Sequence, residues 1–374
     1  TEESRDAREK DENVDMSWAY KNKTVFVGSA YAVDGKCTWN ETDEKWHVTG
    51  VSSHVVWLAP TDGSPAFGHT TVLEGVTIKG GHALTANAGT FNGDKGAGVY
   101  MVRNAELVNC VITENQADGE GGAVYVNGGR ITGSLIYNNE ASKGGGVYMQ
   151  NSGLVLRSVL SNNSAQNGAA VYMKSEDKWT DGLMHPEYLM MSTSVVSHNT
   201  SRKNGAVYCD RGGVVLQSTL TNNLSASVTD DADKTTAHTG GLYIDRYGLV
   251  INSVLWNNLI NGVGVPMYAI NASVENVRFY HTAFSGMNNA VWNNTLQQEL
   301  QSLSENNTGT DTGGLLTPDF TVVGNFVEQV GVQGSWKDIT YYWEPRQGSN
   351  LRSGGMVLGA FPIDCLLYTS DAAD

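Results

Sequence analysis

The sequence has little charge, and especially little positive charge. Charged residues make up 17% of the chain, and 24 Lys and Arg are outnumbered by 39 Asp and Glu, which leaves a net charge of -15. A nucleic-acid-binding protein needs a basic face for the phosphates, so we expect no nucleic-acid partner. The composition also gives no support for binding to an anionic membrane surface or for direct membrane insertion.

Cysteine is scarce as well. Of four cysteines, Cys365 lies in an anomalous tail, and Cys37, Cys110 and Cys209 are far apart. Their spacing matches neither a zinc site nor a disulfide framework. Cys110 and Cys209 fall at positions with a core pattern, so we expect them to be small buried hydrophobic residues.

Both ends of the sequence differ from its middle. Residues 1–20 form a charged run without an initiator Met or a signal peptide, which predicts a truncated or flexible segment. The last ten residues, "CLLYTSDAAD", resemble the direct translation of a transposase adapter used in sequencing libraries. We expect residues 365–374 to be such an artefact and exclude them from reasoning about the fold.

Glycine and a repeated block are abundant. The chain has 43 glycines, and "KGAGVYMV", "GEGGAVYV", "KGGGVYMQ", "NGAAVYMK", "KNGAVYCD" and "TGGLYIDR" follow one another along it. Most of the marker tyrosines are 23 to 25 residues apart, and two gaps of 35 and 36 residues indicate insertions. The tyrosines are Tyr100, Tyr125, Tyr148, Tyr172, Tyr208 and Tyr243, with Tyr268 in a degraded copy.

Hydrophobic residues alternate with a period of two within each unit, which favours short strands. In the first half of a unit, pairs such as Val99 and Met101 are predicted to point inward. In the second half, three alternating positions read apolar, small, apolar, which predicts an inward strand with a narrow centre. The examples are Val108–Cys110–Ile112, Leu156–Ser158–Leu160 and Ile251–Ser253–Leu255.

A unit of about 24 residues cannot bury its inner face alone, but stacked units can. Each strand would then pair with its copy one turn above, at about 4.8 Å, and build parallel sheets wound into a solenoid. A leucine-rich repeat has a similar period, but it requires several Leu at fixed offsets and lacks the "GGAVY" block. The sequence therefore predicts an all-β solenoid over residues 21–284.

One asparagine recurs at the same slot of successive units. Stacked in register, each amide can donate to the carbonyl of the next, which predicts a hydrogen-bonded ladder. Asparagine also tolerates the left-handed conformation that a strand corner requires. Binding of a sugar or a metal by these amides is the alternative. The predicted ladder residues are Asn115, Asn139, Asn163, Asn199, Asn223 and Asn258.

The "GG-A/G-V/I-Y" block, the "NN" turn and "VLEGVTIKGGHA" at residues 72–83 resemble known proteins. They are similar to right-handed parallel β-helix repeat proteins of Bacteroidetes surfaces and to the passenger repeats of chlamydial polymorphic outer-membrane proteins. The resemblance covers about residues 72–284 and extends more weakly to "NLRSGGMVLGAF" at residues 350–361. It implies a right-handed β-helix on the outer surface of a Gram-negative bacterium, exported by a signal and held by an anchor outside this fragment.

Many β-helices cleave polysaccharides, but the sequence offers no recognisable catalytic set. His69 and His82 lack the downstream carboxylates of an inverting hydrolase, and the outward slots lack the base and acids of a lyase. The acidic residues lie in insertions at residues 175–190 and 226–238. Asp230, Asp231 and Asp233 could bind Ca²⁺, but the run lacks defined ligand geometry, so we expect no metal or other cofactor.

The tyrosines offer a candidate ligand site. If Val and Met point inward, then Tyr100, Tyr125, Tyr148, Tyr172, Tyr208 and Tyr243 form an outward stripe that could stack on sugar rings. The alternative is that the rings stack on one another and cover the sheet.

The C-terminal part departs from the repeat. Leu296, Leu300 and Leu303 at helical spacing predict a short helical cap within residues 285–316, and residues 317–364 are predicted to form a closing β segment.

We expect a monomeric, secreted or cell-surface, non-enzymatic protein that contacts a polysaccharide or host-surface glycan. A polysaccharide lyase or glycoside hydrolase is the alternative.

Overall fold

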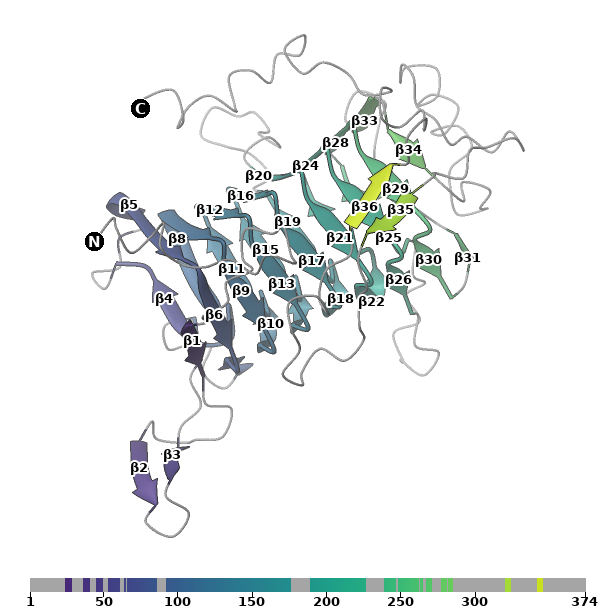
Figure 1. The fold of residues 1–374 in the computed structure, drawn as a ribbon. Coiled ribbons are helices and arrows are strands. Elements are labelled where there is room, and N and C mark those ends of the chain that lie inside the picture. The colour runs from purple at the N-terminus through teal and green to yellow at the C-terminus, as the bar shows by residue number, and fades with distance from the viewer. Residues whose placement is uncertain are drawn as a thin grey trace.

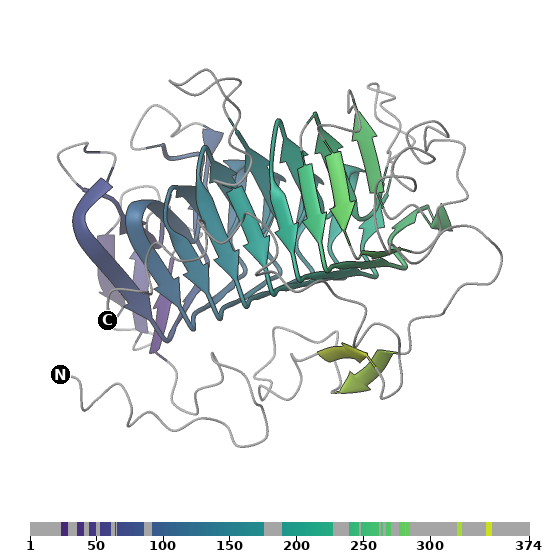
Figure 2. The same cartoon turned by 90° about the horizontal axis from the view of Figure 1, so that it is seen from above.

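The computed structural model describes residues 24–28, 36–40, 45–49, 53–60, 64, 66–85, 92–175, 189–226, 239–246, 248–261, 263–264, 267–270, 277–280, 282–284, 320–323 and 342–345. Short parallel strands of successive coils lie side by side and build a right-handed parallel β-helix (Figure 1). Seen from above, the coils follow one another along a single axis (Figure 2). The all-β solenoid predicted from the repeat is confirmed.

Three sheets run the length of the solenoid. Sheet 1 contains β1 (Thr24–Val27), β6 (Val76–Lys79), β9 (Val111–Thr113), β13 (Leu135–Tyr137), β17 (Val159–Ser161), β21 (Val195–Ser197), β25 (Thr219–Thr221), β29 (Val254–Trp256) and β34 (Ala283–Phe284). Sheet 2 contains β7 (His82–Ala83), β10 (Gln116–Glu120), β14 (Glu140–Lys143), β18 (Ser164–Asn167), β22 (Thr200–Asn204), β26 (Leu224–Ser225), β30 (Leu259–Ile260) and β31 (Val263–Gly264).

Sheet 3 is bent into two arms that share the long strand β8 (Val99–Val108). Arm 3a contains β4 (Val56–Leu58), β11 (Val124–Asn127), β15 (Val147–Gln150), β19 (Val171–Lys174), β23 (Val207–Asp210), β27 (Leu242–Asp245) and β32 (Met267–Ile270). Arm 3b contains β5 (Ala66–Glu74), β12 (Arg130–Thr132), β16 (Gly153–Leu156), β20 (Leu189–Ser192), β24 (Val214–Leu216), β28 (Gly248–Ile251) and β33 (Val277–Tyr280).

One coil visits arm 3a, arm 3b, sheet 1 and sheet 2 in that order, as β11, β12, β13 and β14 show. Each bend of this coil holds a residue with positive φ: Gly128 at +81°, Gly133 at +57°, Asn138 at +54° and Gly144 at +63°. Glycine and asparagine adopt this left-handed conformation at the least steric cost. The glycine and asparagine clusters of the sequence are therefore the bends of the coil.

The left-handed residue at the asparagine bend is not the ladder asparagine. It is the residue before it, as with Asn138 before Asn139 and Asn162 before Asn163. The prediction that the ladder residues themselves need the left-handed conformation is wrong. His198 takes the same position at φ +57°, so it is a turn residue too.

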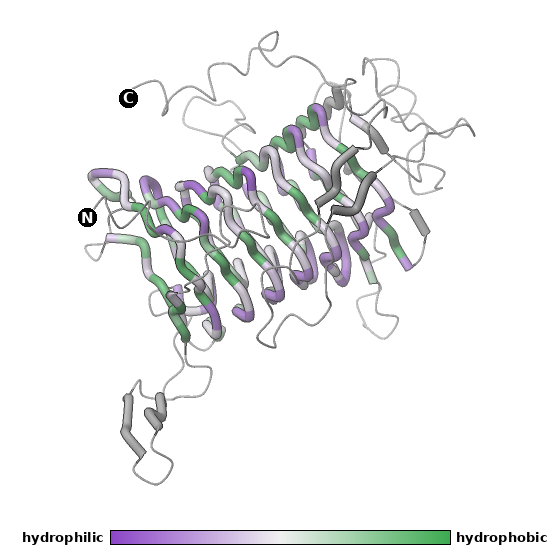
Figure 3. The backbone as a smooth tube through the Cα atoms, viewed as in Figure 1, coloured by the Kyte–Doolittle hydropathy of each residue, from purple (hydrophilic) through white to green (hydrophobic). Residues whose placement is uncertain are grey.

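The inward pairs predicted in arm 3a are confirmed, because Val99, Met101 and their equivalents belong to the main buried core. The hydropathy of the chain repeats from coil to coil in the same way (Figure 3). In arm 3b the predicted inward residues are wrong by one position: Leu107, Val155 and Val250 face the core instead of Val108, Leu156 and Ile251. The left-handed residue at the following bend shifts the alternation by one, so what looked like a single strand is two strands joined at a corner.

Two N-terminal strands pair with the solenoid, β1 with β6 and β4 with β8. Two short antiparallel pairs accompany it, β2 (Lys36–Asn40) with β3 (Lys45–Thr49) and β35 (Phe320–Val323) with β36 (Tyr342–Pro345). The predicted helical cap, the closing segment at residues 350–361 and the adapter-like tail lie outside the described residues, as do residues 176–188 and 227–238 of the acidic insertions. In the described part of the chain, no helix is long and apolar enough to cross a membrane.

Candidate functional site

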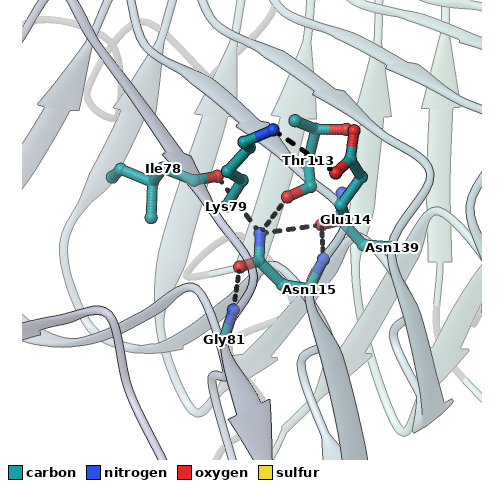
Figure 4. Close-up of polar contacts among 7 residues, drawn as sticks. All are labelled: Ile78, Lys79, Gly81, Thr113, Glu114, Asn115 and Asn139. Carbon is teal, nitrogen blue, oxygen red and sulfur yellow. Dashed lines mark hydrogen bonds and ion pairs between the residues drawn. The ribbon is translucent and has the colours of Figure 1, made fainter. Parts of the chain in front are cut away.

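The predicted asparagine ladder is present between sheets 1 and 2. Each Nδ2 donates to the Oδ1 of the next asparagine, at 3.0 Å from Asn115 to Asn139 and at 2.8 Å from Asn223 to Asn258. The backbone N–H of each donor residue binds the same Oδ1, as Asn115 does at 3.1 Å. Figure 4 shows the first rung, where Asn115 also donates to the carbonyls of Ile78 and Thr113.

The ladder asparagines lie inside the coil. All six are 0–1% exposed, and their amides are engaged by neighbouring rungs and by backbone carbonyls. A buried amide with its hydrogen bonds made stabilises the corner that holds it. This geometry favours the structural interpretation of these residues over sugar or metal binding.

A second ladder, called the serine ladder below, lies between arm 3b and sheet 1. The sequence analysis did not predict it. The backbone N–H of one small residue donates to the Oγ of the next, at 3.1 Å from Cys110 to Ser134 and at 3.2 Å from Ser134 to Ser158. Each hydroxyl donates in turn to the carbonyl two residues before it, as Ser158 does to Leu156 at 2.8 Å. The recurring small residue was visible in the sequence, but its hydrogen bonds depend on the backbone conformation of the corner, which the sequence pattern does not show. The ladder continues through Ser194, Ser218 and Ser253.

The marker tyrosines form a continuous column of stacked rings on the outer side of arm 3a. Neighbouring ring centroids are 5.0 Å apart from Tyr100 to Tyr125 and 4.5 Å apart from Tyr208 to Tyr243. The interplanar angles along the column lie between 4° and 16°. Trp57 extends the column at its N-terminal end, 4.4 Å from Tyr100 and 7° from parallel.

Sequence reasoning missed Trp57 as a member of this column. Its strand pairs in register with the first repeat, so that Val56, Trp57 and Leu58 lie beside Val99, Tyr100 and Met101. The signal was the agreement of "VWL" with "VYM", an aromatic residue between two inward apolar ones.

The rings are largely buried although they lie outside the main core. Five tyrosines of the column are buried, with exposed fractions from 0% for Tyr148 to 8% for Tyr100. Tyr208 is half-buried. Burial raises the pKa of Tyr148 and of Tyr172 well above the usual value of 10.0, and nearby carboxylates such as Glu120 and Asp210 add to the shift. The phenols are therefore neutral across the physiological pH range.

The ring faces of the column are occupied by neighbouring rings. This is the alternative to sugar stacking that the sequence analysis gave, in which the rings stack on one another and cover the sheet. Ligand binding by the tyrosines stays a prediction for Tyr100, Tyr125, Tyr148, Tyr172, Tyr208 and Tyr243.

A row of polar side chains lies beside the aromatic column. These residues lie two positions after the tyrosines on the same outward side of arm 3a, and each is half-buried. The members from Gln150 onward pair in register, and Asn127 takes the equivalent place on β11, where it pairs with Val102. The row consists of Asn127, Gln150, Lys174, Asp210 and Asp245. It is joined to the tyrosines, because the Tyr148 hydroxyl donates to Gln150 Oε1 at 3.3 Å and the Tyr172 hydroxyl donates to Asp210 Oδ2 at 3.0 Å.

The two described cysteine side chains are free and buried, as expected. Cys110 occupies the first position of the serine ladder and donates from Sγ to the Val108 carbonyl at 3.3 Å. Burial raises the pKa of the Cys209 thiol to about 12. The side chain of Cys37 lies outside the described residues.

A search of the described residues finds no group of three or more His, Cys, Asp or Glu side chains that could hold a metal ion. The Ca²⁺ alternative at Asp230, Asp231 and Asp233 falls outside the described residues, so the structure does not test it.

Comparison with known proteins matches one repeat of the chain. Residues 109–127 match the family model of the Chlamydia polymorphic membrane protein repeat. The matched stretch includes Cys110 of the serine ladder, Asn115 of the asparagine ladder and Tyr125 of the aromatic column. No curated protein and no solved structure gives a match. The match suggests a surface-exposed protein, and the chain is a parallel β-helix repeat protein that resembles polymorphic membrane protein passengers.

Proposed function

We propose that this chain is a secreted or surface-displayed, non-enzymatic β-helix that contacts glycans along the outer side of arm 3a. The observation that carries the proposal is the polar row beside the aromatic column. Its members are two amides, one ammonium and two carboxylates, each half-buried. Such groups can hydrogen-bond the hydroxyls of a sugar from a partly dehydrated surface.

The spacing of the row supports a polymer rather than a small ligand. Successive coils bring one polar side chain every 4.8 Å or so along the solenoid axis. A linear glycan lying along that axis would meet an equivalent contact on each coil, and several weak contacts on one chain add in avidity. In this arrangement the buried tyrosines support the polar row through their hydroxyls, as Tyr148 does with Gln150 and Tyr172 with Asp210, since their faces are stacked on one another.

Removing the row while leaving the fold intact tests the proposal. We expect the triple variant Asn127→Ala, Gln150→Ala, Lys174→Ala to lose most of the binding that the parent shows in a screen of acidic and neutral polysaccharides. Arg202→Ala is the matched control, because Arg202 is an exposed basic residue on sheet 2. Circular dichroism checks that the variants keep the parent's strand content.

Two results would contradict the proposal. One is a parent protein that binds no polysaccharide in the screen, and the other is a triple variant that binds as the parent does. The same samples, with and without Ca²⁺, are analysed for shortened chains. Cleavage by the parent would replace the proposal with the lyase or hydrolase alternative.

A further inference from the structure

The aromatic column lies on the outer face of arm 3a, and the oxidisable sulfur atoms of the core lie on the inner face of the same strands. Met101, Met149, Met173 and Cys209 point inward from arm 3a and belong to one register column, in which Val126 is the intervening member. Each follows a tyrosine of the outward column in the sequence. Oxidation of a core methionine turns an apolar side chain into a polar one and disrupts the packing around it.

The column provides an unbroken path between rings. From Trp57 to Tyr243 each ring lies within 5.4 Å of the next, centroid to centroid, and nearly parallel to it. Stacked π systems at this separation are in van der Waals contact. Such contact allows an electron to pass from one ring to a neighbour that has lost one. Trp57 and Tyr208 are half-buried, so they are the members that an oxidant in solution reaches most readily.

Tyr172 has a base within hydrogen-bond distance of its hydroxyl. A phenol that loses an electron becomes strongly acidic, and the radical persists when a neighbouring group accepts its proton. The Tyr172 hydroxyl donates to a carboxylate oxygen of Asp210 at 3.0 Å. The Tyr148 hydroxyl donates to the amide oxygen of Gln150 at 3.3 Å, and the Glu120 carboxylate lies near it. The Tyr172–Asp210 pair thus gives an oxidised ring a carboxylate, at hydrogen-bond distance, that can accept its proton.

We propose that the aromatic column is a relay for one-electron oxidation that protects the core sulfur atoms and holds the oxidised state at Tyr172. A one-electron oxidant of the radical class, such as the carbonate radical, removes an electron from Trp57 or Tyr208 and is itself reduced. Neighbouring rings then supply electrons in turn until Tyr172 supplies one. Tyr172 becomes a neutral phenoxyl radical as its proton passes to the Asp210 carboxylate. A methionine radical cation in the core is reduced to methionine by the adjacent tyrosine through the same relay.

The test exposes the protein to photochemically generated carbonate radicals and measures methionine sulfoxide by mass spectrometry. We expect Tyr148→Phe, which keeps the stacked ring but removes the oxidisable phenol, to show a several-fold increase in sulfoxide at Met149 and Met173. Tyr137→Phe is the matched control, because Tyr137 is a buried tyrosine on sheet 1, outside the column. Hydrogen peroxide, which transfers oxygen without a radical step, should oxidise the wild type and Tyr148→Phe equally.

A second measurement does not depend on changing the stack. Freeze-quenched electron paramagnetic resonance should show a tyrosyl radical in the wild type, and Asp210→Asn should lose most of that signal because the amide does not accept the proton. Equal sulfoxide yields in the wild type, Tyr148→Phe and Tyr137→Phe would overturn the relay. A rise that appears equally with hydrogen peroxide would also overturn it, since it would indicate a loosened core. An unchanged radical signal in Asp210→Asn would overturn the role of Tyr172.

Discussion

The asparagine corner and the serine corner of each coil share one backbone plan and differ in the side chain that completes it. Both place a left-handed residue first and an inward polar residue second, as in Asn162–Asn163 and Arg157–Ser158. At the asparagine corner, side chains bond to side chains from coil to coil. At the serine corner, each backbone N–H bonds to the next hydroxyl, and that hydroxyl returns to its own strand.

The difference follows from the chemistry of the two side chains. A primary amide carries two donor hydrogens and an acceptor oxygen, so one asparagine serves two neighbouring coils and its own. A hydroxyl has a single donor hydrogen, and here it is used within the coil. The asparagine corner therefore couples the coils more strongly, and replacing its residues should cost more.

The largest effect is expected for Asn163→Ala. The change leaves the backbone N–H of Asn139 without its acceptor, removes one of three acceptors of the Asn139 Nδ2, and takes a donor from the Ile136 carbonyl, all in a buried corner. Each buried group left unsatisfied costs about 1–3 kcal/mol, so we expect the free energy of unfolding to fall by about 3–5 kcal/mol in a denaturant titration. The control is Asn162→Gly at the preceding left-handed position, where the change should stay within about 1 kcal/mol.

A smaller effect is expected for Ser158→Ala. This change removes the acceptor of the Ser134 backbone N–H, whereas the Leu156 carbonyl loses the Ser158 hydroxyl but keeps the Gly133 N–H. One buried group is left unsatisfied, so the free energy of unfolding should fall by about 1–2 kcal/mol. The free energy of unfolding should fall by less for Ser158→Cys, because Cys110 shows that a thiol fits this position of the ladder. A loss for Ser158→Ala as large as that for Asn163→Ala would refute the proposed difference between the corners.

The smallest effect at neutral pH is expected on the outer column, with Tyr148→Phe, which keeps the stacked ring. Its effect should appear in alkali. The pKa of Tyr148 is raised above 10.0 in the folded protein, so the folded state keeps a proton that the unfolded state loses above pH 10. The stability contributed by the neutral phenol is thus complete below pH 10 and falls as the pH rises above it. Denaturant titrations above pH 10 should show a shallower loss of stability in Tyr148→Phe than in the wild type, and equal slopes would contradict this.

Much of the fold was predictable from the sequence because the chain repeats. An inward Val or Met, an outward Tyr and an Asn at each turn recur at a near-constant spacing, and only parallel stacking in register satisfies all three. The inward residues of arm 3b were not predictable by alternation. A left-handed residue such as Asn109 or Arg157 shifts the phase by one, and a period-two pattern carries no sign of that shift.

The candidate site divides in the same way. The stacked tyrosines and the asparagine ladder could be predicted, since each needs only one residue type at one slot. The polar row could not, because its slot holds no single residue type: Asn127, Gln150, Lys174, Asp210 and Asp245 include amides, an ammonium and carboxylates. Their common position became visible only when the strands were paired in register.

The sequence by itself determined the repeat, the parallel stacking and the members of the asparagine ladder, because these depend on residue type and spacing alone. The tertiary structure decided how deeply the tyrosines are buried, which hydroxyl faces a base, and that a recurring serine is a hydrogen-bonding corner. Those properties depend on backbone conformation at the bends and on neighbours about one coil away. Residue type and spacing along the chain do not determine the distances between side chains of adjacent coils.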